Sequence, residues 1–222
     1  MLENVPASRF RATDDLIGQY AGPGVGVVEI GASDASFREF HEFGQWTTVD
    51  KYGDPDVHSD LDGVAIRLPF DDASMDLVIC TEVLEHLRMG SALVAEIARL
   101  LKPTGTAVIS VPNICSLKSR LKVAVGKMPN LAASGDCGIP LGGTGALVDG
   151  VWTGGHVVDF SLARLEAYLG RGGLEIKGRH KIPIEIPFAS GRRQVTLPAW
   201  LFPVTLCDFL LVTAKPVAEA RS

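Results

Sequence analysis

Short apolar runs that alternate with helical segments constrain the fold of this chain more than any other feature. Residues 25–30, 75–81 and 106–111 are largely apolar and lack polar alternation, which is typical of strands buried on both faces. Residues 91–101 have apolar side chains at helical spacing, and Lys102-Pro103 stops that helix. Such alternation predicts βαβ units, and the right-handed crossover rule places helices on both faces of a parallel sheet.

The other segments extend this pattern into one domain spanning residues 1–222. An N-terminal segment over 1–24 is expected to be helical. Glycine-rich residues 127–155 and proline-rich residues 183–204 show no periodicity. Long irregular segments of compact domains are often functional, so we expect both to form loops over a binding site. Further elements are expected as helices over 7–20, 36–43 and 161–171 and as strands over 46–50, 56–61, 173–180 and 206–214.

Charge and hydropathy exclude several classes of partner. The net charge of −5 argues against a nucleic-acid partner, because phosphate binding requires clustered basic residues. The basic residues between 118 and 127 are interpreted as a solvated helix face, with an anionic ligand or a membrane surface as the alternative. No apolar run approaches the roughly 20 residues that cross a bilayer. The start of the chain lacks the apolar core of a signal peptide. We therefore expect no transmembrane segment and a cytoplasmic location.

Two acidic positions indicate a nucleotide-like ligand. In VVEIGASDASF (27–37), a strand is followed by Gly31 and small residues, an arrangement that lets the backbone approach a cofactor. An ordinary strand-to-helix turn is the alternative. Asp50 follows about twenty residues after the first acid, where a carboxylate can bind a ribose diol. A solvated turn acid would look the same in the sequence.

Several further motifs carry a family resemblance. Residues 67–87 (RLPFDDASMDLVICTEVLEHL) and 99–113 (RLLKPTGTAVISVPN) resemble the ubiquinone-biosynthesis-type branch of class I S-adenosylmethionine-dependent methyltransferases, also called methyltransferase type 11. The segment GHVVDFSLARLEAYLGRGGLEI, from Gly155, is similar to a later part of the same family. The resemblance spans roughly residues 25–182. It implies a Rossmann-like seven-stranded sheet in the order 3-2-1-4-5-7-6, with strand seven antiparallel.

The resemblance also implies S-adenosylmethionine as the cofactor and assigns residues to it. Glu29, Gly31, Ala32 and Ser33 would face its methionine end, and Thr81 and Glu82 would line the same side. Asp50 would bind the ribose, Lys51 would lie beside the adenine, and Asp60 and Leu61 would flank the ring. The family pattern has glycines where this chain has Ser33, Ala35 and Thr104. These departures leave open a non-catalytic cofactor-binding or scaffold protein.

The proposed chemistry depends on histidine. A hydroxyl acceptor must lose its proton, and a histidine with a pKa near neutrality suits that role. His86 and His156 fall where cofactor and acceptor should meet, with Asp159 as an orienting acid for His156. A structural hydrogen-bonding role is equally compatible with either histidine. Glu85 or Asp149 would otherwise have to carry the reaction.

The sequence thus predicts O-methylation of a small polar acceptor, with a saccharide or glycosylated intermediate favoured. C- or N-methylation of a quinone-like or aromatic compound is the alternative. No residues have metal-ligand spacing, so no metal is assigned, although a weakly held divalent ion stays open. The sequence is also compatible with a homodimer.

Overall fold

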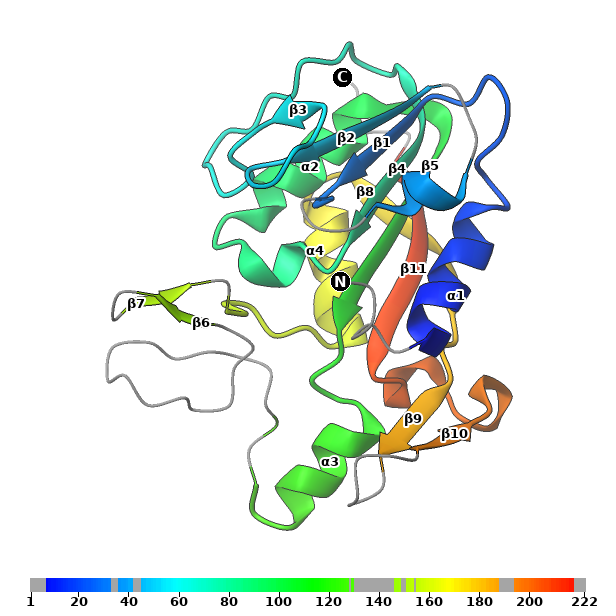
Figure 1. Cartoon of the computed structure of the whole chain (residues 1–222), viewed down its shortest axis with the longest axis vertical. Coiled ribbons are helices and arrows are strands. Elements are labelled where there is room, and N and C mark those ends of the chain that lie inside the picture. The colour runs from blue at the N-terminus through cyan, green and yellow to red at the C-terminus, as the bar shows by residue number, and fades with distance from the viewer. Residues whose placement is uncertain are drawn as a thin grey trace.

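The computed structural model describes residues 7–32, 36–41, 45–127, 129, 146–148, 151–153, 155–187 and 194–217. Within these residues, seven strands form one sheet in the order β3-β2-β1-β4-β5-β11-β8 (Figure 1). When the strands of this sheet are numbered along the chain, the order is 3-2-1-4-5-7-6. The last strand, β11, is antiparallel to both of its neighbours, and the other pairs are parallel. The predicted sheet order and the antiparallel last strand are confirmed.

The main elements follow the predicted alternation. The strands of the sheet are β1 (Val27–Ile30), β2 (Trp46–Asp50), β3 (Val57–His58), β4 (Met75–Thr81), β5 (Leu101–Pro112), β8 (Leu174–His180) and β11 (Phe209–Pro216). The α-helices are α1 (Ala7–Ile17), α2 (Gly90–Leu100), α3 (Leu117–Ala124) and α4 (Leu162–Arg171). Three short 3₁₀ helices and two short strands lie at the carboxyl end of the sheet. The 3₁₀ helices are η3 (Leu84–His86), η4 (Ala199–Leu201) and η5 (Val204–Leu206), and the strands are β9 (Ile184–Pro187) and β10 (Gln194–Leu197).

Helices cover both faces of the sheet, as the lack of polar alternation in the strands predicts. Leu16 and Ile17 of α1 pack on one face, together with Leu77 and Ile79 of β4. The intervening strand residues face α2 and α4, and Val78 is among them. Figure 1 shows α1 on the opposite side of the sheet from α2 and α4. Burial on both sides excludes water from the strands and leaves their carboxyl ends as the edge where a ligand can enter.

The last segment of the chain differs from the prediction. Residues 183–204 were expected to be irregular, but β9 and β10 pair as an antiparallel hairpin, from Ile184 opposite Leu197 to Pro187 opposite Gln194. The two strands have four residues each, which is too short for a clear alternation in the sequence. The prolines lie at the edges of this hairpin, where a missing N–H does no harm. Residues 188–193 lie outside the described part of the chain.

Several other boundaries also differ: α1 ends at Ile17, β3 covers only Val57–His58, and β11 runs from Phe209 to Pro216. The segment expected as a helix over 36–43 forms a single 3₁₀ turn, η2 (Phe37–Phe40), and residues 42–43 are not described. Strand β5 begins at Leu101, five residues earlier than predicted. Its register against β4 shifts between Met75 and Leu77. This irregularity accommodates Pro103, which has no N–H to donate to the ladder.

The chain leaves the sheet after β5 and returns to the same place. The backbone N–H of Ile114 donates to the carbonyl of Phe160 at 2.9 Å, and Asn113 pairs with Phe160 as a parallel bridge. The buried Asn113 side chain donates to the carbonyls of Thr205 and Cys207 at 3.0 and 2.8 Å. The Pro-Asn motif therefore anchors the point of departure. Most of the predicted acceptor loop 127–155 lies outside the described residues, which here include the paired strands β6 (Ala146–Val148) and β7 (Val151–Thr153).

Among the described residues, no helix combines the length and the apolar character that a membrane crossing requires.

Candidate active site

A cleft of about 500 Å³ opens at the carboxyl ends of β1, β2 and β4. This is the edge where open α/β sheets bind ligands. Six of the residues assigned to the cofactor lie in its wall: Gly31, Asp50, Lys51, Asp60, Leu61 and Glu82. The remaining lining residues are Tyr52, Asp62, Val83, His86 and Leu87.

Two unusual backbone conformations shape this cleft. Gly31 has a φ of +88°, and a Cβ at this position would lie 2.2 Å from Cγ2 of Val83. The β1 turn therefore approaches the segment after β4 more closely than any side chain would allow. Glu82 has a φ of +57°, which is uncommon for a residue other than glycine. Such strain persists where the surrounding structure holds it, often at functional sites.

Contacts from two other elements hold Glu82. Nη1 of Arg9, on α1, lies 2.7 Å from Oε2 of Glu82, and the hydroxyl of Ser110, on β5, donates to Oε1 at 2.8 Å. Both side chains of the ion pair are largely buried. The guanidinium of Arg9 also lies 4.2 Å from the ring centre of Phe209. The N-terminal helix is thus connected directly to the wall of the cleft.

Asp50 and Lys51 begin the loop after β2. Asp50 is buried, and its Oδ1 accepts a hydrogen bond from the backbone N–H of Tyr52 at 2.9 Å. This contact orients the carboxylate at the cleft. Lys51 is paired with Asp60 at 3.0 Å, and both side chains are exposed. The pair connects the loops after β2 and β3 at the rim.

The other residues assigned to the cofactor lie outside the cleft lining. The buried carboxylate of Glu29 accepts hydrogen bonds from the hydroxyl of Ser36, the N–H of Phe37 and the indole of Trp46, at 2.5, 2.9 and 2.9 Å. Burial raises the pKa of Glu29 above its ordinary value, and these hydrogen bonds act against that rise. Its observed contacts fix the turn after β1. Ala32 and Thr81 are partly buried nearby, and Ser33 lies outside the described residues.

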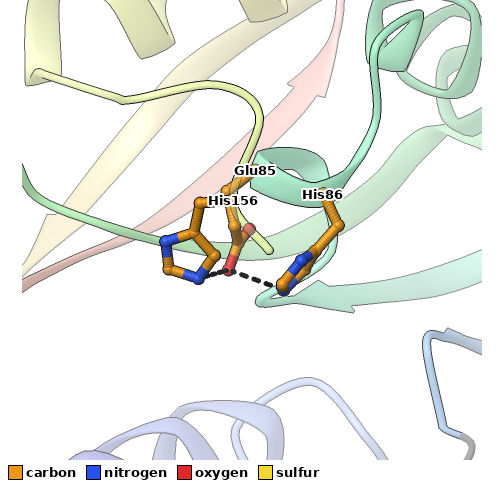
Figure 2. Close-up of side chains that lie close together, drawn as sticks. All are labelled: Glu85, His86 and His156. Atoms are coloured by element: carbon orange, nitrogen blue, oxygen red, sulfur yellow. Dashed lines mark ion pairs between the residues drawn. The ribbon is translucent and has the colours of Figure 1, made fainter. Parts of the chain in front are cut away.

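The two predicted catalytic histidines meet beside a buried acid (Figure 2). Nε2 of His86 and Nε2 of His156 lie 3.8 and 3.9 Å from Oε1 of Glu85, and the ring centres are 4.8 Å apart. His86 lies in the cleft wall, and it follows Glu85 in η3. His156 comes from the segment before α4. We call Glu85, His86 and His156 the Glu-His-His cluster.

Backbone contacts bring together the two halves of this cluster. The N–H groups of Val157 and Val158 both donate to the carbonyl of Glu85, at 2.7 and 3.1 Å. Nδ1 of His86 lies 3.3 Å from the carbonyl of Gly155. The segment that carries His156 is therefore attached to η3 by residues directly before and directly after His156.

The carboxyl group of Glu85 lies in an environment that opposes its charge. Its side chain is 1% exposed, and neither oxygen has a hydrogen-bond partner among the described residues. Burial, reinforced by the charge of Glu82, raises the pKa of Glu85 to about 9. Asp159, expected to orient His156, has a buried Oδ1 that accepts no hydrogen bond within the described chain.

A second cleft of about 240 Å³ lies between α1, α3 and the ends of β5 and β11. Arg9 contributes to its wall, and its ion pair with Glu82 connects this wall to the first cleft. Pro183 and Glu185 also line it, so one end of the segment predicted to cover the acceptor reaches a cavity. Lys118 is paired with Asp208 at 2.6 Å, which removes one charge from the basic face of α3.

The sequence reading missed several of these relationships. Arg9 was not considered, because nothing in the sequence indicates that a residue of the first helix meets Glu82. Glu85 was considered only as a substitute base, because its distance from His156 cannot be read from their spacing. Tyr52 and Asp62 also line the cleft, and their positions directly after the assigned residues Lys51 and Leu61 could have indicated this.

Comparisons with known proteins agree with this geometry. Residues 44–109 match the family described as "Methyltransferase domain". No curated protein matches the sequence. Among solved structures, a Burkholderia thailandensis 1,6-didemethyltoxoflavin-N1-methyltransferase with bound S-adenosylhomocysteine is 17% identical, with a TM-score of 0.54 over 95% of this chain and 79% of that one.

Two further structures are similar in fold. An S-adenosylmethionine-dependent methyltransferase from Mesorhizobium loti is 17% identical, with a TM-score of 0.56 over 95% of this chain and 98% of that one. The CcbJ methyltransferase from Streptomyces caelestis is 14% identical, with a TM-score of 0.56 over 96% and 97%. The family match and the fold therefore confirm the resemblance to class I S-adenosylmethionine-dependent methyltransferases, without specifying the ubiquinone-type branch.

Proposed function

We propose that this protein transfers a methyl group from S-adenosylmethionine to a hydroxyl of a small polar acceptor. The observation that carries the proposal is the cleft at the ends of β1, β2 and β4, which has His86 of the Glu-His-His cluster in its wall. Its volume of about 500 Å³ falls within the roughly 300–1,000 Å³ typical of small-molecule sites.

The residues of the cleft fit this cofactor. Leu61, Val83 and Leu87 supply apolar surface for a flat ring, and Asp50 supplies a carboxylate for a diol. The lining contains four carboxylates and one lysine; the carboxylates are those of Asp50, Asp60, Asp62 and Glu82. An acidic wall suits a ligand that has a sulfonium and an ammonium group. When bound, the cofactor supplies an electrophilic methyl group on a cationic sulfur.

The two histidines are proposed to act on the acceptor. An alcohol keeps its proton at neutral pH, so its oxygen becomes a good nucleophile only when the proton is removed. His86 is 35% exposed and lines the cleft, whereas His156 is 9% exposed and is not among the residues that line it. We assign His86 and His156 to deprotonation of the acceptor hydroxyl. Proximity of the bound donor and acceptor in the cleft supplies the rest of the rate enhancement.

The preferred acceptor is a saccharide or a glycosylated intermediate. This preference rests on the polar character of residues 127–155, which include Asp149 and Trp152. Asp149 lies outside the described residues, and the side chain of Trp152 is not described. The Burkholderia structure is named for an N-methyl transfer, so nitrogen acceptors form the main comparison in the test.

The test separates cofactor binding from turnover. Calorimetry with S-adenosylmethionine and S-adenosylhomocysteine should show one site in the purified protein. Transfer of a labelled methyl group should then be measured on oligosaccharides, phenols, quinols and amines. Label on a sugar hydroxyl supports the full proposal, whereas exclusive labelling of nitrogen or carbon assigns the alternative chemistry. If neither cofactor form binds, the chain is not a methyltransferase, and the scaffold hypothesis stands.

A further inference from the structure

We propose that the Glu-His-His cluster binds one divalent transition-metal ion. Nε2 of His86 and Nε2 of His156 lie 3.8 and 3.9 Å from Oε1 of Glu85, and the three residues each offer a ligand atom within 4.8 Å of the others. Figure 2 shows both rings directed at the same carboxylate oxygen. Two imidazoles and one carboxylate form a recurrent ligand set for catalytic zinc and for related transition metals.

The distances fit an ion better than direct contact. At 3.8 and 3.9 Å, neither nitrogen is close enough to Oε1 for a hydrogen bond, which requires about 2.7–3.2 Å. Two ligand atoms on a tetrahedral zinc ion, each about 2.0–2.1 Å from it, are separated by about 3.3 Å. Shortening each of these two nitrogen–oxygen separations by about half an ångström would bring the atoms to that spacing.

The buried carboxylate provides a second, independent indication. The side chain of Glu85 is 1% exposed, and neither of its oxygens accepts a hydrogen bond from the described residues. A buried carboxylate normally has a partner, because removing it from water is costly. A cation held between Glu85 and the two rings would supply that partner.

The contact at the second ring nitrogen of His86 is arranged as it is in known metal ligands. The carbonyl of Gly155 can only accept, so Nδ1 of neutral His86 carries its hydrogen at their 3.3 Å contact. Nε2 of His86 then presents a lone pair toward Oε1 of Glu85. A ligating histidine usually donates its other N–H in this way.

The position of the cluster gives the ion a role that rests on the proposed function. Three protein ligands leave at least one coordination position open, and His86 lies in the wall of the cleft. An acceptor hydroxyl bound there would lose its proton more easily, because a metal ion lowers the pKa of a bound hydroxyl. The oxygen–hydrogen bond breaks and releases the proton to solvent, and an oxygen–carbon bond forms. The carbon–sulfur bond breaks with its electron pair kept by sulfur.

This role refines the assignment of the two histidines. An Nε2 atom that binds a metal has no lone pair left to accept a proton. The metal would thus replace the histidines as the group that directly promotes deprotonation, and the rings would become its ligands. The two forms of the proposal predict different responses to chelation.

The decisive experiment measures binding of the metal alone. Chelator-treated protein should be titrated with Co²⁺, followed by its visible d–d absorption, and with Zn²⁺ in competition. One ion per chain is expected, with a tetrahedral or five-coordinate Co²⁺ spectrum. Glu85→Gln, His86→Gln and His156→Gln should each weaken binding by more than the roughly 10–100-fold that loss of a supporting contact costs.

A matched control uses a histidine outside the cluster. His58 on β3 is exposed, so His58→Gln should bind metal like the unsubstituted protein. Far-UV circular dichroism and binding of S-adenosylhomocysteine establish that each variant is folded. The proposal is overturned if no stoichiometric binding occurs, or if the cluster variants bind the metal as the His58→Gln control does.

Cofactor binding distinguishes failure of this inference from failure of the proposed function. Binding of S-adenosylhomocysteine without metal binding overturns the metal site and leaves the methyltransferase proposal standing. Metal binding without binding of either cofactor form overturns the methyltransferase proposal and leaves the metal site standing. Where both bind, loss of methyl transfer on chelation and recovery with Zn²⁺ or Mn²⁺ support the Lewis-acid role. Unchanged turnover in the metal-free protein returns that role to the histidines.

Discussion

Substitution of Asp50 tests whether the cleft binds the cofactor in the proposed orientation. Asp50 is 8% exposed, lies at the end of β2 and lines the cleft together with Gly31 of the β1 turn. A hydrogen bond to a charged group typically contributes about 1.5–3 kcal/mol. Asp50→Ala should therefore weaken binding of S-adenosylhomocysteine by about 10–150-fold.

The contact with Tyr52 separates two causes of such a loss. Alanine also removes the acceptor of the Tyr52 N–H, so part of its effect would come from reorganisation of the loop. Asp50→Asn keeps an oxygen for that N–H and removes the charge. The Asp50→Asn protein should bind S-adenosylhomocysteine about 10-fold more weakly, at the low end of that range, because neutral hydrogen bonds are roughly half as strong.

Calorimetry with the unreactive S-adenosylhomocysteine is the appropriate assay, with urea unfolding to verify stability. Asp54→Ala is the matched control, because Asp54 is an exposed acid in the same loop and does not line the cleft. Unchanged affinity in a folded Asp50→Ala protein would refute the orientation. Equal weakening by the control would indicate a general charge effect in its place.

Three further predictions concern the supports of the site and the sheet. Gly31→Ala should lower the free energy of unfolding by about 1–3 kcal/mol in urea, because it combines a positive φ with a clash against Val83, and an added Val83→Ala should recover only part of the loss. Arg9→Met should cost about 1–2 kcal/mol by leaving Glu82 without its cation, and a loss no larger than that of the exposed Arg11→Met would argue against a structural role for this pair. Burial lowers the pKa of His180, so the unfolded chain binds a proton at this residue more readily; stability should fall as the pH drops below about 6.5, and His180→Gln should reduce that slope in pH-dependent unfolding.

The parts of the fold set by local pattern could be predicted from the sequence. The strand from Met75 to Thr81 has the predicted boundaries, and the helix that ends at Leu100 stops one residue earlier than predicted, because apolar periodicity and proline act within a few residues. The sheet order came from the family resemblance and not from the pattern, since alternation alone leaves the order of strands open.

The site was predictable in location and not in its contacts. The strand-end rule placed Asp50 and His86 at one edge, where the structure has the cleft. The hydrogen bonds of Glu29 to Ser36 and Trp46 depend on side-chain packing that no spacing encodes. The meeting of Glu85 with His156 depends on two backbone hydrogen bonds across a long stretch of chain.

The return of the chain to its point of departure has a consequence for how this protein can vary. Because Ile114 and Phe160 are joined by a backbone hydrogen bond, the whole excursion between them is a loop whose ends are already closed. The entropy of closing a loop grows only with the logarithm of its length, by about 0.6 kcal/mol for each doubling. The excursion could therefore lengthen, shorten or be exchanged at little cost to the sheet. A cofactor platform with such an exchangeable module can acquire new acceptors while its methyl-donor site is inherited unchanged.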